Sequence, residues 1–275
     1  MSAKALVIAG YGLNCEEETA FAFSHVGFDA DIIHVNDLAE HPDRLDDTQV
    51  LCVPGGFSYG DDTGSGNAFA QKMRLTLQDK LKEFVSRDTL TLGICNGCQV
   101  VMNLGLVPAI DEQYGERTVA VTHNLTARYQ CRWVDVAVQE TSSPWLQGIS
   151  SLHIPVAHGE GRFMMAGETL KTLKDMKQIA LRYAKPSGEI AGGEFPYNPN
   201  GSTDDIAGMT DPSGRVLTLM PHPERGMFMS QRDDYMILKD KARREGKSLP
   251  EAADGMAIFE NAGRYFETGK IKKSA

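Results

Sequence analysis

The chain lacks any long apolar run, and this absence limits where it can work. No stretch of its 275 residues approaches the roughly 18 consecutive apolar residues of a membrane-spanning helix. The apolar run at residues 5–9, close to the start, is too short for the core of a signal peptide. We therefore expect a soluble, cytoplasmic protein that has no membrane partner.

The sequence also lacks an excess of positive charge and an even number of cysteines. Lysine and arginine number 28 against 37 aspartates and glutamates, so the formal net charge is -9. A nucleic-acid-binding surface needs clustered cations, and we expect no nucleic acid partner, although a few placed cations would suffice for a small anion. Five cysteines in a long chain favour free thiols in a reducing compartment over a disulfide framework.

Apolar runs alternate with helical patterns in the first third of the chain. The predicted strands span residues 5–9, 30–35, 49–53 and 89–94. A capping-box pattern, Asn14 followed by Glu17, predicts a helix through about Val26, and apolar spacing predicts another over residues 67–85. Continuous apolar strands separated by helices predict an α/β fold, with a mostly parallel central sheet covered on both faces, as in flavodoxin-like proteins.

The middle of the chain has strand-like segments without long helices between them. These segments span residues 118–122, 131–138 and 152–156, and they predict a small antiparallel extension. Residues 179–183 predict another strand and residues 205–209 and 215–220 predict a hairpin, whereas the last sixth of the chain reads as helical. No repeat or linker divides the sequence, so we expect a single domain over residues 1–275. Its core would span about residues 4–228, followed by a C-terminal helical extension at 229–275 whose role is open.

The most informative segment is Gly93-Ile94-Cys95-Asn96-Gly97, between a predicted strand and a helical pattern. Small residues on both sides of a central nucleophile indicate a nucleophile elbow, a turn so tight that larger flanking side chains would clash. A thiol at a helix N-terminus is favoured as the reactive thiolate. The segment therefore predicts that Cys95 attacks a carbonyl carbon.

A cysteine nucleophile needs a base, and His222 is the best placed histidine. It lies in Pro221-His222-Pro223-Glu224, after a predicted strand, where the two prolines favour an extended chain. In such a segment Glu224 lies on the same side as His222 and can hold one imidazole nitrogen. The pattern predicts a Cys95–His222–Glu224 triad, against the simpler interpretation of a loop histidine beside a surface glutamate.

Donors for a developing oxyanion are predicted at two places. The backbone N–H of Asn96 follows the nucleophile directly, and the turn Pro54-Gly55-Gly56-Phe57 ends a strand that should neighbour the elbow. Glycines there let the backbone approach a substrate closely. An ordinary strand-ending turn is the alternative.

Cys95 and Cys98 also form a C-x-x-C pattern, for which a redox pair is a competing interpretation. The glycines beside Cys95 favour the elbow instead, and Cys98 is expected to be a packed thiol. No second Cys/His pair occurs at ligand spacing, so we expect no metal site. Cys15, Cys52 and Cys131 are expected to be structural.

Several segments together resemble class I, triad-type glutamine amidotransferases. The segments that carry this resemblance are Gly93–Gln99, Pro221–Arg225 and Pro54–Asp61. Within that class the chain is most similar to the family of glutaminase subunits of phosphoribosylformylglycinamidine synthases, which act in purine synthesis. The segments that narrow the resemblance are Phe57–Asp61, His158–Phe163 and Asn198–Ser202. The resemblance covers roughly residues 4 to 228.

The resemblance implies a role for each residue of the site. Cys95 would attack the side-chain amide of L-glutamine and form a thioester, while His222, oriented by Glu224, protonates the leaving ammonia and then activates water. Gln99 matches a position that helps to hold glutamine, with a solvated helix residue as the alternative. His158, Gly159 and Glu160 match a loop beside the glutamine pocket that acts through its backbone. His158 could instead be a turn histidine or a rival base.

Ammonia must reach an acceptor, and the sequence shows no ATP site for activating one. The resemblance implies a synthetase partner that binds ATP, Mg²⁺ and formylglycinamide ribonucleotide, and in many such complexes a small third subunit, with no cofactor in this chain. Three alternatives stay open. They are the glutaminase subunit of another amidotransferase, a related elbow-cysteine hydrolase or deglycase, and a non-enzymatic regulatory subunit.

Overall fold

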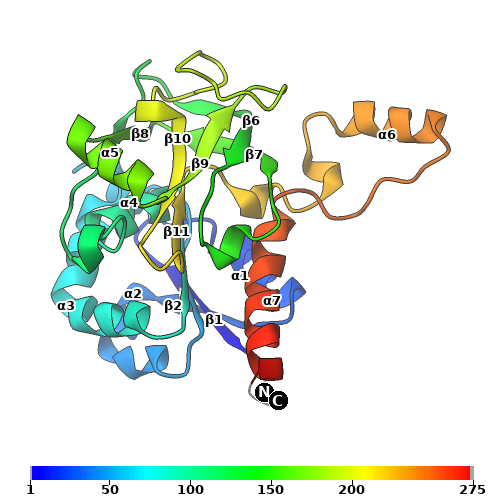
Figure 1. The fold of residues 1–275 in the computed structure, drawn as a ribbon. Helices are drawn as coiled ribbons and strands as arrows, with labels where there is room; N and C mark the ends of the chain where they lie inside the picture. Colours follow the sequence, from blue (N-terminus) through cyan, green and yellow to red (C-terminus); the bar gives the residue numbers. More distant parts are fainter. Residues whose placement is uncertain (1, 273–275) are drawn as a thin grey trace.

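The computed structural model describes residues 2–272 (Figure 1). The strands are β1 Lys4–Ala9, β2 Asp29–His34, β3 Val50–Val53, β4 Leu90–Ile94, β5 Ala120–His123, β6 Gln130–Val138, β7 Ser151–His158, β8 Glu160–Met164, β9 Ile179–Ala184, β10 Ile206–Thr210 and β11 Val216–Leu219. The α-helices are α1 Glu16–His25, α2 Val35–Glu40, α3 Asn67–Ser86, α4 Asn96–Asn103, α5 Gly167–Asp175, α6 Tyr235–Arg244 and α7 Met256–Lys272.

A nine-stranded sheet forms the centre, in the order β2–β1–β3–β4–β11–β10–β9–β6–β7. The neighbours from β2 to β11 pair in parallel, and those from β11 to β7 pair antiparallel. Strands β5 and β8 form a separate antiparallel pair. All residues of β3, β4 and β11 are buried, as expected for parallel strands covered on both faces. The α/β fold class predicted from the sequence is confirmed.

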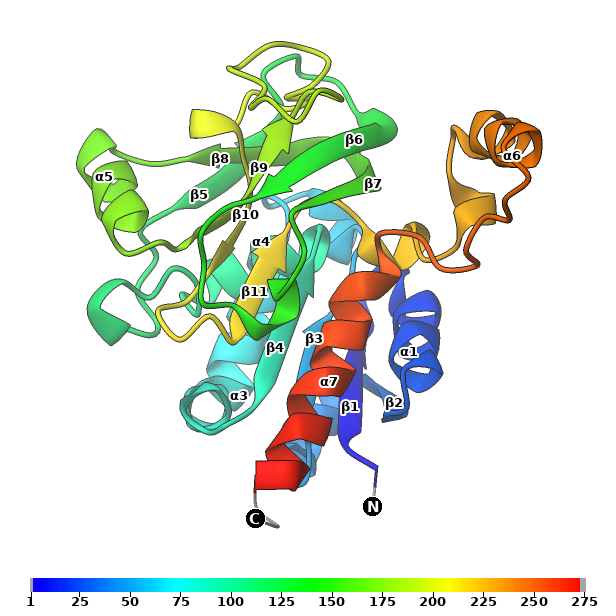
Figure 2. The ribbon, with the colours of Figure 1, turned by 45° about the vertical axis from the view of Figure 1, so that its right-hand side comes forward.

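Helices cover the parallel half of the sheet on both faces. Helices α3 and α4 pack together on one face, whereas α1 and α7 pack together on the other (Figure 2). The ring of Phe23 in α1 meets that of Phe259 in α7 edge-on, with centroids 5.1 Å apart. Ile258 and Phe259 are completely buried. Helix α7 is therefore part of the core, although the sequence placed it in an extension.

Helix α6 is arranged differently from the other helices. Every residue of α6 is at least partly exposed, and the helix projects from the body on two connecting segments (Figures 1 and 2). In the described part of the chain, no helix combines the length and apolarity needed to cross a membrane.

The predicted capping box of the first helix is wrong. The residue at the N-cap of α1 is Cys15, and no side chain caps the helix there. Asn14 lies one position before the N-cap, and its Oδ1 accepts a hydrogen bond from the thiol of Cys15 at 3.3 Å. Three glutamates in the first turn, residues 16–18, complement the positive end of the helix dipole instead. The helix ends at His25, next to the predicted end.

A histidine joins the antiparallel part of the sheet to the segment that leads to α6. The imidazole of His153 in β7 lies 2.9 Å from Asp135 Oδ1 through Nδ1 and 3.0 Å from Asp233 Oδ1 through Nε2. It also stacks on Trp133, with ring centroids 5.2 Å apart. Burial lowers the pKa of His153, but the hydrogen bonds with Asp135 and Asp233 outweigh burial and raise the pKa above its ordinary value.

This contact should make stability depend on pH. A raised pKa in the folded state means that His153 stabilises the fold fully below the ordinary histidine pKa of about 6.5. That contribution is lost as the pH rises through the raised value. We expect His153→Gln to lower the free energy of unfolding in urea by about 1 kcal/mol more at pH 6 than at pH 9. An equal loss at both pH values, as from lost stacking on Trp133 alone, would contradict the assignment.

Candidate active site

The candidate site lies where neighbouring parallel strands end. Strands β3, β4 and β11 run in parallel with β4 in the middle, so their carboxyl ends meet at one edge of the sheet. The segments that follow them contain Gly55 and Gly56, Cys95, and His222, respectively. Crevices at the carboxyl ends of such strands are the usual ligand-binding places of open α/β sheets. Residues more than 160 positions apart thereby come together.

The turn at Cys95 has the geometry of a nucleophile elbow. Cys95 has a φ of 51° and a ψ of -108°, an uncommon backbone conformation, and forms the N-cap of α4. A Cβ on Gly97 would lie 1.8 Å from the carbonyl oxygen of Val53, and one on Gly93 would lie 2.9 Å from that of Gly97. The prediction that side chains larger than glycine would clash on both sides of the cysteine is confirmed.

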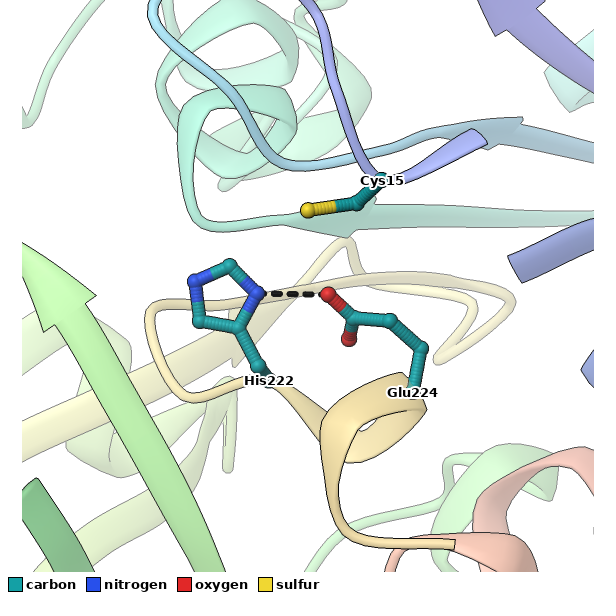
Figure 3. A group of neighbouring side chains, drawn as sticks. All are labelled: Cys15, His222 and Glu224. Carbon is teal, nitrogen blue, oxygen red and sulfur yellow. Dashed lines mark hydrogen bonds and ion pairs between the residues drawn. The ribbon is translucent and has the colours of Figure 1, made fainter. Parts of the chain in front are cut away.

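His222 and Glu224 form a buried pair beside the elbow. Nδ1 of His222 lies 2.5 Å from Oε1 of Glu224, and each residue is only 1% exposed (Figure 3). Because Glu224 occupies Nδ1, the other ring nitrogen, Nε2, is left for a further partner. Burial opposes a charge on the imidazole, but the charges of Glu224 and Cys95 outweigh it and hold the pKa of His222 well above its ordinary value. Nε2 of His222 is buried and has no hydrogen-bond partner among the described residues, while the thiol of Cys95 donates to the carbonyl oxygen of Ala157 at 3.7 Å.

The backbone beside the histidine differs from the sequence-based expectation. His222 is extended, with φ -106° and ψ 91°, but Pro223–Arg225 form a short 3₁₀ helix in place of the expected extended chain. Proline is tolerated at the first position of a helical turn because its missing N–H has no partner there anyway. The turn still brings the Glu224 carboxylate back to the imidazole.

The glycine turn after β3 packs closely against the segment after β1. A Cβ on Gly56 would lie 2.5 Å from the carbonyl oxygen of Gly12, so only glycine fits. The N–H of Phe57 donates to the same oxygen at 2.8 Å and is therefore not available to an oxyanion. This removes Phe57 as a backbone donor and leaves Gly55 and Gly56, with Asn96, as the candidates. Asn96 begins α4, where N–H groups have no partner within the helix.

The side chain of Asn96 has a role that the sequence did not predict. Its Oδ1 accepts a hydrogen bond from the N–H of Ser58 at 3.1 Å, and its Nδ2 donates to Gln99 Oε1 at 2.7 Å. The first bond ties the elbow to the segment that follows the glycine turn, and the second lies within α4. Gln99 is 3% exposed and donates through Nε2 to the carbonyl oxygen of Glu160. The alternative of a solvated Gln99 is thus wrong.

His158 is held as a neutral, structural histidine. Its Nδ1 lies 3.1 Å from Oδ1 of Asn124, which also accepts from the N–H of Gly161 at 3.1 Å. Burial and the nearby charge of His222 lower the pKa of His158 to about 3. The carboxylate of Glu160 accepts from the N–H of Ser65 at 3.2 Å and does not serve His158. These contacts argue against His158 as a rival base.

Two asparagines support the segment from His158 to Gly161. Nδ2 of Asn124 donates to the carbonyl oxygen of His158 at 2.9 Å, and Nδ2 of Asn200 donates to that of Gly161 at 2.8 Å. Gly159 lies between them, with its carbonyl oxygen bonded to the N–H of Asn124 at 2.9 Å. Asn124 carried no sequence signal, whereas Asn200 lay in a motif without an assigned role.

The second thiol of the C-x-x-C pattern is packed inside the protein. Cys98 is completely buried, and burial raises the pKa of its thiol. The close packing of Gly93 and Gly97 beside Cys95 is a requirement of the elbow and favours it over a redox pair. Cys98 fits the expectation of a packed thiol.

Several classes of elbow-cysteine enzyme share this fold, and a family match assigns the chain to one of them. A family model of the CobB/CobQ-like glutamine amidotransferase domain matches residues 2–266. The match covers nearly the whole chain, and the chain belongs to this family.

Individual relatives and a solved structure show which members of this family the chain is similar to. The phosphoribosylformylglycinamidine synthase subunit PurQ of Methanococcus maripaludis is 47% identical over 264 residues, which cover 96% of this chain and 97% of that protein. The subunit of the same name from Dehalococcoides mccartyi is 37% identical over 263 residues, covering 95% and 97%. A chain in the structure of PurLQS from Thermotoga maritima is similar with a TM-score of 0.69 and 27% identity, over 97% of this chain and 100% of that one.

Proposed function

We propose that this chain is the glutaminase subunit of phosphoribosylformylglycinamidine synthase. It hydrolyses L-glutamine to glutamate and ammonia and supplies the ammonia for the synthesis of formylglycinamidine ribonucleotide. The observation that carries the chemistry is the buried His222–Glu224 pair beside the elbow thiol of Cys95. The assignment to this synthase is supported by relatives of that name along the whole chain.

The geometry supports a two-step hydrolysis. The thiolate of Cys95 attacks the side-chain carbonyl carbon of glutamine, while the N–H group of Asn96 and one from the Gly55–Gly56 turn stabilise the oxyanion. The carbon–nitrogen bond then breaks, and His222 gives its proton to the departing ammonia. In the second step, His222 takes a proton from water, whose oxygen attacks the thioester and releases glutamate and the thiol. Glu224 keeps the imidazole oriented and stabilises its charged form.

The glutamine pocket is framed by Gln99 and the segment from His158 to Glu160. The amide of Gln99 is bonded to Asn96 on one side and to the carbonyl oxygen of Glu160 on the other. Gln99 therefore acts by holding the pocket wall in place. His158, Gly159 and Glu160 present their backbone to the substrate, as the buried, neutral state of His158 supports.

The ammonia is used by a synthetase partner. That partner holds ATP, Mg²⁺ and formylglycinamide ribonucleotide, with a small third subunit in the assembly, and this chain needs no cofactor of its own. An exposed aromatic pair at the mouth of the site supports docking there. Phe57 is 41% and Tyr129 51% exposed, their ring centroids lie 6.1 Å apart, and the charge of Cys95 acts on Tyr129. The complex works in the cytoplasm.

Partner binding should activate the site. The Gly55–Phe57 turn carries the exposed Phe57 ring, so a partner that covers this ring also fixes the oxyanion donors. We expect glutamate production by the purified chain to rise about tenfold or more when the cognate synthetase subunit is added. The measurement is a coupled glutamate assay with and without the partner, ATP and formylglycinamide ribonucleotide. Full activity of the isolated chain would contradict the activation.

A glutamine-analogue diazoketone separates this function from its closest rivals. The compound should alkylate Cys95 in a stoichiometric, glutamine-protected reaction that peptide mapping locates. A deglycase or peptide hydrolase would not be protected by glutamine. Formation of formylglycinamidine ribonucleotide by the reconstituted complex then distinguishes this synthase from other amidotransferases.

A further inference from the structure

A second thiol lies beside the proposed catalytic histidine. Cys15 is completely buried. Its Sγ, a ring nitrogen of His222 and a carboxylate oxygen of Glu224 lie within 4.8 Å of one another (Figure 3). The sequence assigned this cysteine a structural role, whereas its side chain points at the pair on which the chemistry depends.

The hydrogen bonds of Cys15 lead away from its own helix. Although Cys15 is the N-cap of α1, its side chain makes no capping bond. Its thiol donates to Asn14 Oδ1 at 3.3 Å, and its sulfur accepts a hydrogen bond from Nη2 of Arg225 at 2.8 Å. The sulfur therefore binds the cation that directly follows Glu224 in the chain.

Arg225 is close enough to compete with His222 for Glu224. Its Nε lies 4.0 Å from Oε1 of Glu224 and 3.9 Å from Oε1 of Glu18. The second oxygen of Glu224, Oε2, is buried and has no hydrogen-bond partner among the described residues. A guanidinium binds a carboxylate best through two parallel bonds, so a small shift would bring Arg225 onto this free oxygen. Glu224 would then share its charge with Arg225.

We propose that Cys15 is a positioning residue, whose sulfur holds the Arg225 guanidinium away from Glu224 and so reserves this carboxylate for His222. The proposal rests on the glutaminase function above. Packing supports it, because a Cβ on Gly55 would lie 2.7 Å from Cε1 of His222 and 3.1 Å from Sγ of Cys15. The ring and the sulfur thus press against the same glycine, at the edge of the oxyanion turn.

The arrangement predicts a specific pH signature. The charged and titratable groups that act on His222 or respond to its charge are Glu224, Cys95, Cys15, His158 and Tyr129. Of these, Glu224 is the group that Arg225 would bond if it left the sulfur of Cys15. If Arg225 bonds to Glu224, the imidazolium loses stabilisation and the pKa of His222 falls. The basic limb of the pH profile, where the imidazolium loses its proton, then moves to lower pH.

Two substitutions at Cys15, both close to cysteine in size, distinguish the effect of the hydrogen bond from Arg225 from the effect of packing. Cys15→Val fills the space but cannot accept from Arg225, whereas Cys15→Ser keeps an acceptor. In the complex with the synthetase, we expect Cys15→Val to shift the basic limb of kcat/KM for glutamine down by about half a pH unit or more and to lower kcat about tenfold. Cys15→Ser should stay within about threefold of the native chain. Adding Arg225→Gln to Cys15→Val should return the basic limb of kcat/KM to its native pH.

The opposite pattern would overturn the proposal. If Cys15→Val keeps the native limb, or if Arg225→Gln does not restore it, the sulfur only fills space. Should Cys15→Val fail to fold, Cys15→Ala serves as the variant without an acceptor. NMR titration of the His222 imidazole in the isolated chain gives the same comparison without turnover. A native complex that forms no glutamate would refute the glutaminase function, while the titration still reports on Cys15.

Discussion

Cys95→Ala should abolish glutamine-dependent synthesis while sparing synthesis supported by free ammonia. The substitution removes the atom that attacks the amide, and neither His222 nor the oxyanion donors can form the thioester alone. We expect glutamine-dependent product formation by the complex to fall by about four orders of magnitude or more. The measurement compares formylglycinamidine ribonucleotide formation with glutamine and with an ammonium salt at mildly alkaline pH.

The chain offers a matched control for this experiment. Cys98 lies one helical turn beyond Cys95 and is completely buried, so Cys98→Ala removes a thiol of the same helix without touching the elbow. Cys98→Ala should keep glutamine-dependent activity within about threefold. Equal loss in both variants would indicate damage to α4, and equal loss of ammonia-supported synthesis in Cys95→Ala would show that the thiol also acts outside glutamine hydrolysis.

Gly97→Ala should destabilise the whole fold. The added Cβ would lie 1.8 Å from the carbonyl oxygen of Val53 and 2.9 Å from that of Pro54, both backbone atoms that cannot move alone. Relief requires α4 to shift away from β3, where the oxyanion turn begins. We expect the free energy of unfolding to fall by about 3 kcal/mol or more and glutamine hydrolysis to be lost with it.

Chemical denaturation of Gly97→Ala and Gly167→Ala side by side provides the measurement. Gly167 is the first residue of α5, as Gly97 is the second of α4, but no atom lies within 4 Å of a Cβ placed on Gly167. Alanine favours a helix over glycine, so Gly167→Ala should be neutral or slightly stabilising. A Gly97→Ala chain as stable as the native one would mean that the elbow is looser than the structure indicates.

The catalytic residues could be predicted because each of their sequence patterns lies within a few neighbouring positions. The elbow is readable from Gly93 to Gly97, since the steric demand falls on residues next to the nucleophile. The His222–Glu224 pair was also readable, although the reason given for it, an extended chain, was wrong. The apolar runs of the parallel strands located the sheet edge at which these segments meet.

The hydrogen bonds that support the site could not be predicted in this way. Asn124 holds His158 across 34 positions, and Cys15 meets Arg225 across 210, so no local pattern connects either pair. No sequence pattern predicted strand β8 (Glu160–Met164), whose pairing partner β5 lies about 40 positions earlier in the chain. The capping box failed because the helix begins one residue later than predicted, with Cys15 at its N-cap.

The position of β11 has a consequence for protein synthesis. This strand occupies the middle of the nine-strand order, yet among residues 2–272 it is the last strand to occur along the chain. Domains emerge from the ribosome N-terminus first, so the nascent polypeptide exposes the reactive sulfur more than a hundred residues before the imidazole that activates it. A translation product that stops before this strand therefore carries an inert thiol, and unfinished or truncated copies consume no glutamine.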